Sequence, residues 1–262
     1  MIKMVITDLD DTLLHSDKSI SAYTISVLRQ CQAKGIRVVF ATARSTQASA
    51  RFLTQFMPDV FVGYGGALVT SGSEALRKFD IPAAISHQLI RECLNTPEIT
   101  SVLAINECVA LTNNPKELEA SDSSHYRYAD FSEDYGCGYL KISVVASSPE
   151  AVERIASHYP MCDMLRYTGE DLYRFANRRA LKWNAVQAIA AHYHADTDSF
   201  AAFGDDRNDV EMIENCGYGV AVANAIDEVK AAAKYMCGPN NDDGVAKWLE
   251  EHALQASSAQ IN

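Results

Sequence analysis

Short continuous apolar runs alternate with segments of helical spacing over the first sixty residues of the chain. One helix is expected between the first two runs, with Ser21 as its N-cap and Gly35 at its end, and a second is expected through Phe52. The apolar runs predict strands buried on both faces, at 2–6, 36–41 and 59–63. This order of strands and helices predicts an α/β fold with a doubly wound, Rossmann-like parallel sheet.

The pattern changes after a predicted hairpin at 67–79. Pro82 marks the expected boundary, and from there to Asn177 short strand candidates accompany helices at 86–94 and after Pro149. Strands and helices arranged around one small sheet predict an inserted α+β domain. The expected division is therefore a core domain of residues 1–81 plus 178–262 and an inserted domain of residues 82–177.

The doubly wound pattern resumes after the insertion. A helix at 181–193 is followed by an apolar run that predicts a buried strand at 199–204. The remaining expected elements are a helix from Val210, a strand at 218–222, a helix from Ala225 and a strand at 235–237. They would complete the sheet that the first sixty residues begin.

Composition narrows the classes of partner. The chain has 262 residues, of which 48% are hydrophobic, and a formal net charge of -11 without any Lys/Arg-rich run. This charge argues against binding to nucleic acid or to an anionic membrane, because both require a basic surface. Small anionic substrates remain compatible with it, since a bound divalent cation reverses the local field.

The seven cysteines are scattered and include no Cys-x-x-Cys pair, which favours reduced thiols in the cytoplasm over disulfides or a zinc site. No secretory signal is recognised at the N-terminus, and no apolar run approaches the length that spans a membrane. The sequence leaves the oligomeric state open between a monomer and a homodimer.

Two acidic clusters each follow an apolar strand of the same domain. The first is Asp8-Leu-Asp10-Asp-Thr12, and the second lies within Gly204-Asp-Asp-Arg-Asn-Asp209. If the two strands are neighbours, Asp8, Asp205 and Asp209 converge at one edge of the sheet, where open α/β sheets bind ligands. Oxygen ligands of this kind suit Mg²⁺. Taken alone, each cluster also has a simpler interpretation as the start of a helix.

Three further side chains have the chemistry that a phosphate requires. Thr42 and Arg44 lie at another strand end, and Lys182 lies in the first turn of a helix, where a cation opposes the helix dipole unless it faces anions. Individually, each is also compatible with an ordinary strand-terminal or solvated residue. Their order and placement favour a phosphate site.

The ordered set Asp8-x-Asp10-x-Thr12, Thr42, Lys182 and Gly204-Asp205-Asp206-x-Asn208-Asp209 resembles the four motifs of the haloacid dehalogenase (HAD) superfamily. The insertion between the second and third motifs resembles the cap domain of its Cof-type sugar-phosphatase branch, and the resemblance covers essentially the whole chain. It implies a phosphatase that hydrolyses a small phosphorylated metabolite, such as a sugar phosphate, with Mg²⁺ as cofactor.

The resemblance also implies a role for each motif residue. Asp8 would be the nucleophile that forms an aspartyl-phosphate, and Asp10 would be the general acid and base. Mg²⁺ would be bound by Asp8, the Asp10 backbone carbonyl and Asp205, with support from Asp209. Phosphoryl oxygens would be bound by Thr42 and Lys182, with help from Asn208.

The chain departs from the family pattern at three places. It has Thr42-Ala-Arg44 where relatives usually have Thr-Gly-Arg, Gly65-Gly-Ala67 where many have Asn-Gly-Ala, and Trp183 where Gly is common. Arg44 and Gly66, which match the pattern beside two of these departures, are candidates for contacts to the substrate or between the cap and the core.

Three alternative functions remain open from the sequence. A phosphotransferase or mutase would use the same aspartyl-phosphate but pass the phosphate to a sugar hydroxyl. A phospho-accepting signalling domain would also use an acidic pocket with Thr and Lys, although Asp10 and the insertion argue against it. A catalytically idle binding protein is the third, and the presence of every motif residue argues against that.

Overall fold

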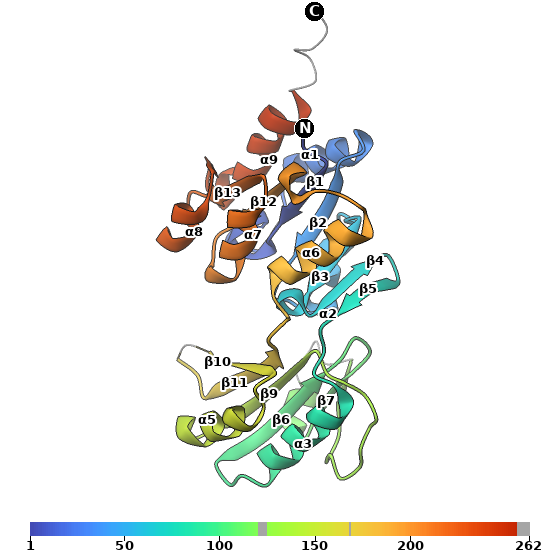
Figure 1. Cartoon of the computed structure of the whole chain (residues 1–262), viewed down its shortest axis with the longest axis vertical. Coiled ribbons are helices and arrows are strands. Elements are labelled where there is room, and N and C mark those ends of the chain that lie inside the picture. The colour runs from blue at the N-terminus through green and yellow to red at the C-terminus, as the bar shows by residue number, and fades with distance from the viewer. Residues whose placement is uncertain (120–124, 168, 256–262) are drawn as a thin grey trace, which may run out of the picture. The chain divides into compact units, whose positions relative to one another are not determined.

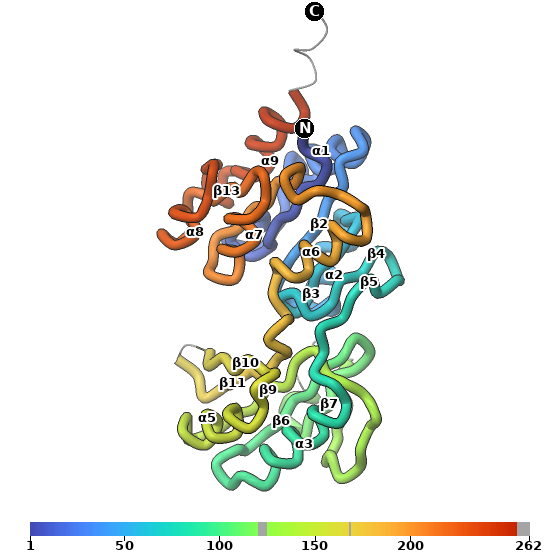
Figure 2. The backbone as a smooth tube through the Cα atoms, in the orientation of Figure 1, coloured from blue at the N-terminus to red at the C-terminus, as the bar shows by residue number. Residues whose placement is uncertain are grey.

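The chain folds into two compact units, and the computed structural model describes residues 1–119, 125–167 and 169–255. The first unit comprises Met1–Arg77 and Leu181–Asn262, and the second comprises Lys78–Ala180. The chain passes from the first unit to the second after Arg77 and returns at Leu181 (Figure 2). The predicted boundaries at residues 82 and 177 both fall inside the second unit. Among the described residues, no helix has the length and apolar character needed to cross a membrane.

An eight-stranded sheet forms the centre of the first unit, in the order β14-β13-β12-β1-β2-β3-β4-β5. The strands from β14 to β3 run parallel to one another, and β4 pairs antiparallel with β3. The bounds are β1 Met4–Thr7, β2 Arg37–Ala41, β3 Val60–Gly63, β4 Leu68–Ser71, β5 Glu74–Lys78, β12 Phe200–Gly204, β13 Tyr218–Val222 and β14 Tyr235–Cys237. This sheet confirms the predicted α/β, doubly wound class.

α-Helices precede or follow the parallel strands along the chain, and the last of these helices follows β14. They are α1 Ala22–Ala33, α2 Thr46–Leu53, α6 Lys182–His192, α7 Val210–Asn215, α8 Asp227–Ala232 and α9 Gly244–Leu249. Right-handed crossovers that proceed in opposite directions from a central strand place their helices on opposite faces of the sheet. Accordingly, α1 packs with α9, and α6 packs with α7 (Figure 1). As predicted, Ser21 caps α1, because its side chain accepts a hydrogen bond from the Thr24 N–H.

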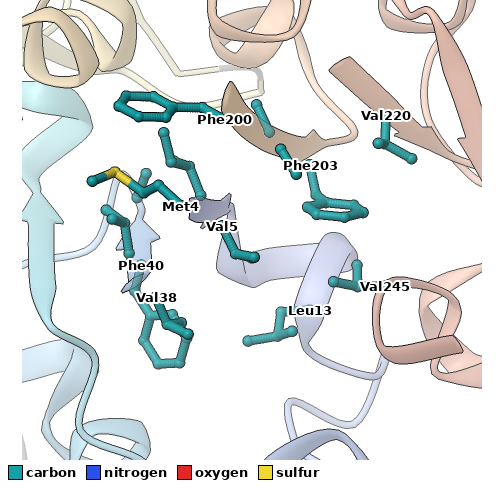
Figure 3. Packing of buried hydrophobic residues seen from close by; sticks show 14 of the residues in the cluster. Met4, Val5, Leu13, Val38, Phe40, Phe200, Phe203, Val220 and Val245 are labelled. Atoms are coloured by element: carbon teal, nitrogen blue, oxygen red, sulfur yellow. The ribbon is translucent and has the colours of Figure 1, made fainter. Parts of the chain in front are cut away.

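The core of the first unit is built around β1. All four β1 residues are buried, and Met4 and Val5 pack among side chains of β2 and β12 (Figure 3). Leu13 and Val245, which come from the turn after β1 and from α9, extend this packing at one end (Figure 3). A strand buried on both faces has a continuous apolar sequence, which is why the run at 2–6 was readable as a strand.

Strand register brings the predicted site to one edge of this sheet. Thr7, the last residue of β1, pairs with Phe40 of β2 and with Phe203 of β12. The three parallel strands therefore end at the same level, and Asp8, Thr42 and Asp205 leave the sheet side by side.

The second unit contains a six-stranded sheet in the order β10-β11-β9-β6-β7-β8. Its elements are α3 Ala83–Leu94, β6 Ile99–Ile105, β7 Ala110–Thr112, α4 Pro115–Leu118, β8 Tyr126–Tyr128, β9 Lys141–Ala146, α5 Pro149–His158, β10 Cys162–Arg166 and β11 Leu172–Asn177. Most pairs are antiparallel, whereas β7 and β8 run parallel. Apolar residues of α3 and α5 share one core with alternate residues of the strands, so the helices cover one face of this sheet.

Candidate active site

Asp8 lies directly after β1 and is almost fully buried, with 6% of its surface exposed. Its backbone N–H donates to the Phe203 carbonyl of β12 at 3.0 Å, and its own carbonyl accepts from the Thr7 hydroxyl at 2.7 Å. The backbone is thus fixed by a neighbouring strand. A buried carboxylate requires a charged partner, because transfer of an unpaired charge from water into a protein interior is very costly.

Lys182 is that partner, and it has no exposed side-chain surface. Its Nζ donates to Asp8 Oδ1 at 2.5 Å and to Asp209 Oδ1 at 2.6 Å. Lys182 is the first residue of α6, where the helix dipole disfavours a cation. The two carboxylates compensate, which agrees with the expectation that this lysine faces anions.

The second acidic cluster folds back on itself after β12. Asp209 is fully buried, and its Oδ2 accepts from the backbone N–H groups of Asp205 and Asp206 at 3.2 and 3.3 Å. Asp205 Oδ1 in turn accepts from the Thr12 hydroxyl at 2.7 Å, which ties the second cluster to the first. Gly204 makes this turn feasible, since a Cβ there would lie 2.4 Å from the Asp209 Cβ.

One carboxylate oxygen from each of Asp8, Asp205 and Asp209 lies within 4.8 Å of the others. Burial raises the pKa of Asp8, with Lys182 opposing and Asp209 adding to the rise. Burial also raises the pKa of Asp205 to about 6, against the hydrogen bond from Thr12. Burial alone would lower the pKa of Lys182, but the two carboxylates outweigh it and raise that pKa. Three carboxyl groups thus face one lysine, and burial together with their mutual repulsion disfavours the ionised forms of Asp8 and Asp205.

These residues fit a hard divalent cation. Mg²⁺ takes oxygen ligands and is usually held by one or two carboxylates, with water and phosphate oxygens completing its coordination. Asp8 and Asp205 offer such oxygens, and Asp209 holds the loop that carries Asp205. A cation would offset the burial and the mutual repulsion that raise the two carboxyl pKa values.

Asp10 lies in the turn Leu9–Leu13 and points to a different partner. Arg44 binds both Asp10 carboxylate oxygens: its Nε lies 2.6 Å from Oδ2 and its Nη2 lies 2.6 Å from Oδ1. Lys18 Nζ lies 3.2 Å from Asp10 Oδ1. Partial burial would raise the Asp10 pKa, but Arg44 and then Lys18 outweigh it and lower that pKa. In this structure Asp10 is therefore held as a carboxylate.

The remaining predicted residues lie around this centre. Thr42 is buried beside the end of β2, and its hydroxyl oxygen accepts from the Arg44 N–H at 3.1 Å. Asn208 is exposed in the short turn Arg207–Asp209. Gly66 has a φ of +108° and packs against the start of α6, since a Cβ there would lie 2.3 Å from the Leu181 carbonyl. Its observed role is close packing, and any contact to substrate stays a prediction.

The loop that follows Asp8 is held by hydrogen bonds with Asn224 and with residues 240–243. The Asn224 side chain donates to the Asp11 carbonyl at 2.7 Å, and the Asn240 side chain donates to the Leu14 carbonyl at 2.9 Å. Asp243 Oδ1 accepts hydrogen bonds from Ser21 and Thr24, and the His15 ring lies 3.0 Å from it.

The contact of Lys18 with Asp10 and the contacts of Asp243 with Ser21, Thr24 and His15 were not predicted from the sequence. Lys18 lies in a polar stretch without a regular pattern, and Asp243 has left-handed backbone angles that no neighbouring residue signals. Positive φ values at Asp11 and Lys18 were equally unmarked. Asparagine-rich composition at 240–241 was the available signal, since asparagine side chains often bond to backbone groups in turns.

Residues 5–249 match the family model of haloacid dehalogenase-like hydrolases. A 5-amino-6-(5-phospho-D-ribitylamino)uracil phosphatase of Bacillus subtilis is 27% identical, over 95% of this chain and 97% of its own length. A haloacid dehalogenase-like hydrolase of Bacteroides thetaiotaomicron has a related structure with a TM-score of 0.81, 24% identity and coverage of 96% of this chain and 99% of its own. A sugar phosphatase of HAD subclass IIB has a TM-score of 0.76 and 20% identity, over 95% of this chain and 98% of its own.

The family model covers nearly the whole chain, and the motif residues converge at one edge of the doubly wound sheet. The chain belongs to the haloacid dehalogenase-like hydrolases, in their Cof-type branch, and is a phosphatase.

Proposed function

We propose that the protein hydrolyses the phosphomonoester of a small metabolite, such as a sugar phosphate, through an aspartyl-phosphate formed on Asp8. The observation that carries this proposal is the cluster at the end of β1. Asp8 lies there 2.5 Å from the Lys182 ammonium group, and its carboxylate lies within 4.8 Å of those of Asp205 and Asp209. A carboxylate nucleophile divides a difficult hydrolysis into two easier steps.

In the first step, an Asp8 carboxylate oxygen attacks phosphorus and the bond to the leaving alkoxide breaks. Asp10, in its protonated form, donates its proton to that alkoxide, so the metabolite leaves as an alcohol. Lys182 and the Thr42 hydroxyl bind the phosphoryl oxygens, and the lysine charge stabilises the negative charge that develops there. Asp8 and Asp205, with support from Asp209, would hold Mg²⁺, which would supply further charge stabilisation as a Lewis acid.

In the second step, water attacks the phosphorus of the aspartyl-phosphate, the bond to Asp8 breaks, and inorganic phosphate leaves. Asp10 accepts the proton of that water as its general base. The Arg44 and Lys18 contacts hold Asp10 ionised, which is the form that this step requires. Proton donation in the first step requires the carboxyl group to leave Arg44.

The leaving group proposed is a small polyhydroxylated molecule. The relative from Bacillus subtilis is named for a phosphate ester of a ribityl chain, which is a sugar alcohol. A hydrolysis screen over phosphorylated sugars, nucleotides and cofactors, with and without Mg²⁺, would identify the substrate class.

All seven cysteines are free, and the cytoplasmic location expected from them stays a prediction that cell fractionation would test.

Substitution of the nucleophile tests the proposed chemistry. Asp8→Asn should lower turnover of p-nitrophenyl phosphate by more than about 10³-fold, since removal of a nucleophile leaves only the residual effect of binding and electrostatics. Asp227→Asn is the matched control, because Asp227 is an exposed aspartate in the first turn of α8. Undiminished hydrolysis by Asp8→Asn would rule out the aspartyl-phosphate.

A further inference from the structure

The turn that carries Asp10 has an unusual backbone at the next residue. Asp11 has left-handed angles, with a φ of +56° and a ψ of +10°. A residue other than glycine keeps such angles only where surrounding contacts enforce them. Lys18 is a weak source of such a contact, because its Nζ lies 3.3 and 3.4 Å from the oxygens of a half-exposed carboxylate, and surface ion pairs contribute little. The conformation of this turn therefore depends on what binds its backbone.

Asn224 binds this backbone from a distant part of the chain. Its side-chain Nδ2 donates to the Asp11 carbonyl at 2.7 Å, across a sequence separation of 213. Its side-chain oxygen accepts from the Asn240 N–H at 2.9 Å, so the amide group is held at both ends. Asn240 is itself buried and donates its side chain to the Leu14 carbonyl at 2.9 Å. Two carbonyl groups that follow Asp10 are thus fixed by one pair of asparagines.

The position of Asp10 depends most on this backbone when Asp10 acts as an acid. In the structure, Arg44 and Lys18 hold its side chain through the ionised carboxylate. In the proposed first step the carboxyl group is protonated and has left Arg44, so its position then follows from the turn itself. Asn224 is exposed and lies between β13 and α8, outside both elements, so its side chain adds little to the core. Its contact to the turn is therefore separable from a role in folding.

We propose that Asn224 is a positioning residue for the general acid. Through the Asp11 carbonyl, it holds the turn in the conformation from which the Asp10 carboxyl group reaches the leaving oxygen. This role rests on the proposed phosphatase function. General acid catalysis contributes about 10²–10⁴-fold and requires hydrogen-bond reach between the acid and the leaving group. A misplacement of about 1 Å can cost about 10²-fold, so a contact to the neighbouring peptide is sufficient to affect the rate.

Two esters that differ by one methylene group distinguish a positioning role from a structural one. p-Nitrophenyl phosphate releases a weakly basic phenolate, which leaves without a proton. p-Nitrobenzyl phosphate releases a strongly basic alkoxide, which needs a proton from Asp10. The ratio of the two kcat/KM values, benzyl over phenyl, therefore measures how well Asp10 protonates the leaving group. A loss of folded protein lowers both values equally and leaves this ratio unchanged.

Asn224→Ala should lower the ratio about tenfold, because the turn loses the contact that fixes Asp10. Asn224→Asp should have the same effect, since an ionised carboxylate has the same size as the amide but cannot donate. Asn215→Ala is the matched control. Asn215 is an exposed residue of the same unit whose side chain also donates to a backbone carbonyl, that of Glu211 at 2.8 Å. In this control the ratio should stay within about twofold of wild type.

The Arg44 Nε–H resonance gives a readout that does not depend on turnover, because this group donates to Asp10 at 2.6 Å. It should shift in Asn224→Ala and in Asn224→Asp and stay in place in Asn215→Ala. An unchanged ratio of kcat/KM values, or an unshifted Arg44 resonance, in the two Asn224 variants would overturn the proposal. If the wild-type chain hydrolyses neither ester, the proposed function fails, and the Arg44 resonance still decides whether Asn224 sets the position of Asp10.

Discussion

Lys182→Met should destabilise the first unit strongly. The side chain is fully buried between Asp8 and Asp209, with Nζ–O distances of 2.5 and 2.6 Å. Removal of one partner from a buried charge cluster leaves uncompensated charges and costs about 3–5 kcal/mol. For a chain of this size, that loss corresponds to a melting temperature lower by about 10 °C.

The deficit should depend on pH with a definite sign. Lys182 lowers the pKa of Asp8, so its removal raises that pKa further above the value in the unfolded chain. A carboxyl group with a raised folded-state pKa adds stability below its unfolded pKa, and this stability is lost as the pH rises through the folded pKa. The difference between variant and wild type should therefore shrink as the pH falls from about 9 to about 7, across the wild-type Asp8 pKa of about 8.

Calorimetry on both proteins at the two pH values measures this effect. Lys247→Met is the control for an exposed lysine, and the double variant Lys182→Met/Asp209→Asn should recover part of the loss, because it also removes one buried charge. A Lys182→Met melting temperature within about 2 °C of wild type at both pH values would refute the reasoning.

Three other perturbations test the site. Arg44→Met removes the main group that lowers the Asp10 pKa, while Lys18 stays. The stabilisation from this partly exposed pair, about 1 kcal/mol, should be present above the unfolded Asp10 pKa and lost as the pH falls through the lowered folded pKa; melting curves against pH would contradict this if the difference persisted in acid. Gly204→Ala places a methyl group within 2.6 Å of the buried Asp209 carboxylate. It should lower the free energy of unfolding by about 1–3 kcal/mol and weaken Mg²⁺ binding in calorimetric titrations. Gly238→Ala is the control and should change neither quantity, because its methyl group would lie 3.5 Å from the nearest atom, the Gly244 Cα. Chelation of Mg²⁺ should abolish turnover. The measured Mg²⁺ affinity should fall as the pH drops through about 6, because Asp205 takes up a proton there. An affinity that does not depend on pH would argue against the Asp205 carboxylate as a ligand.

The framework of the site was predictable from the sequence because β1 and β12 are apolar on both faces. Their ends are visible as the points where Asp8 and Asp205 interrupt the apolar runs, and parallel pairing brings those points together. For Lys182, the sequence indicated only that a cation in the first turn of a helix opposes the helix dipole and so should face anions. The structure shows those anions to be Asp8 and Asp209.

The pairing of Asp10 with Arg44 and Lys18 was not predictable in the same way. It depends on the direction of side chains in the turn after β1, where Asp11 and Lys18 have positive φ values although neither is glycine. Elements such as α4 and β8 have four and three residues, too few for periodicity to identify. Backbone angles of irregular segments follow from tertiary contacts, so local sequence does not determine them.

The pairing of β1 has a consequence for the order of folding. Contacts just after its end join residues that are far apart in the chain, with a sequence separation of 193 from Thr12 to Asp205 and of 174 from Asp8 to Lys182. The second unit, in contrast, is one continuous segment, Lys78–Ala180. Contacts of large sequence separation form slowly, and domains fold as units during synthesis. We therefore expect the second unit to fold on the ribosome before β12 is synthesised and pairs with β1, so that the cluster around Asp8 forms last.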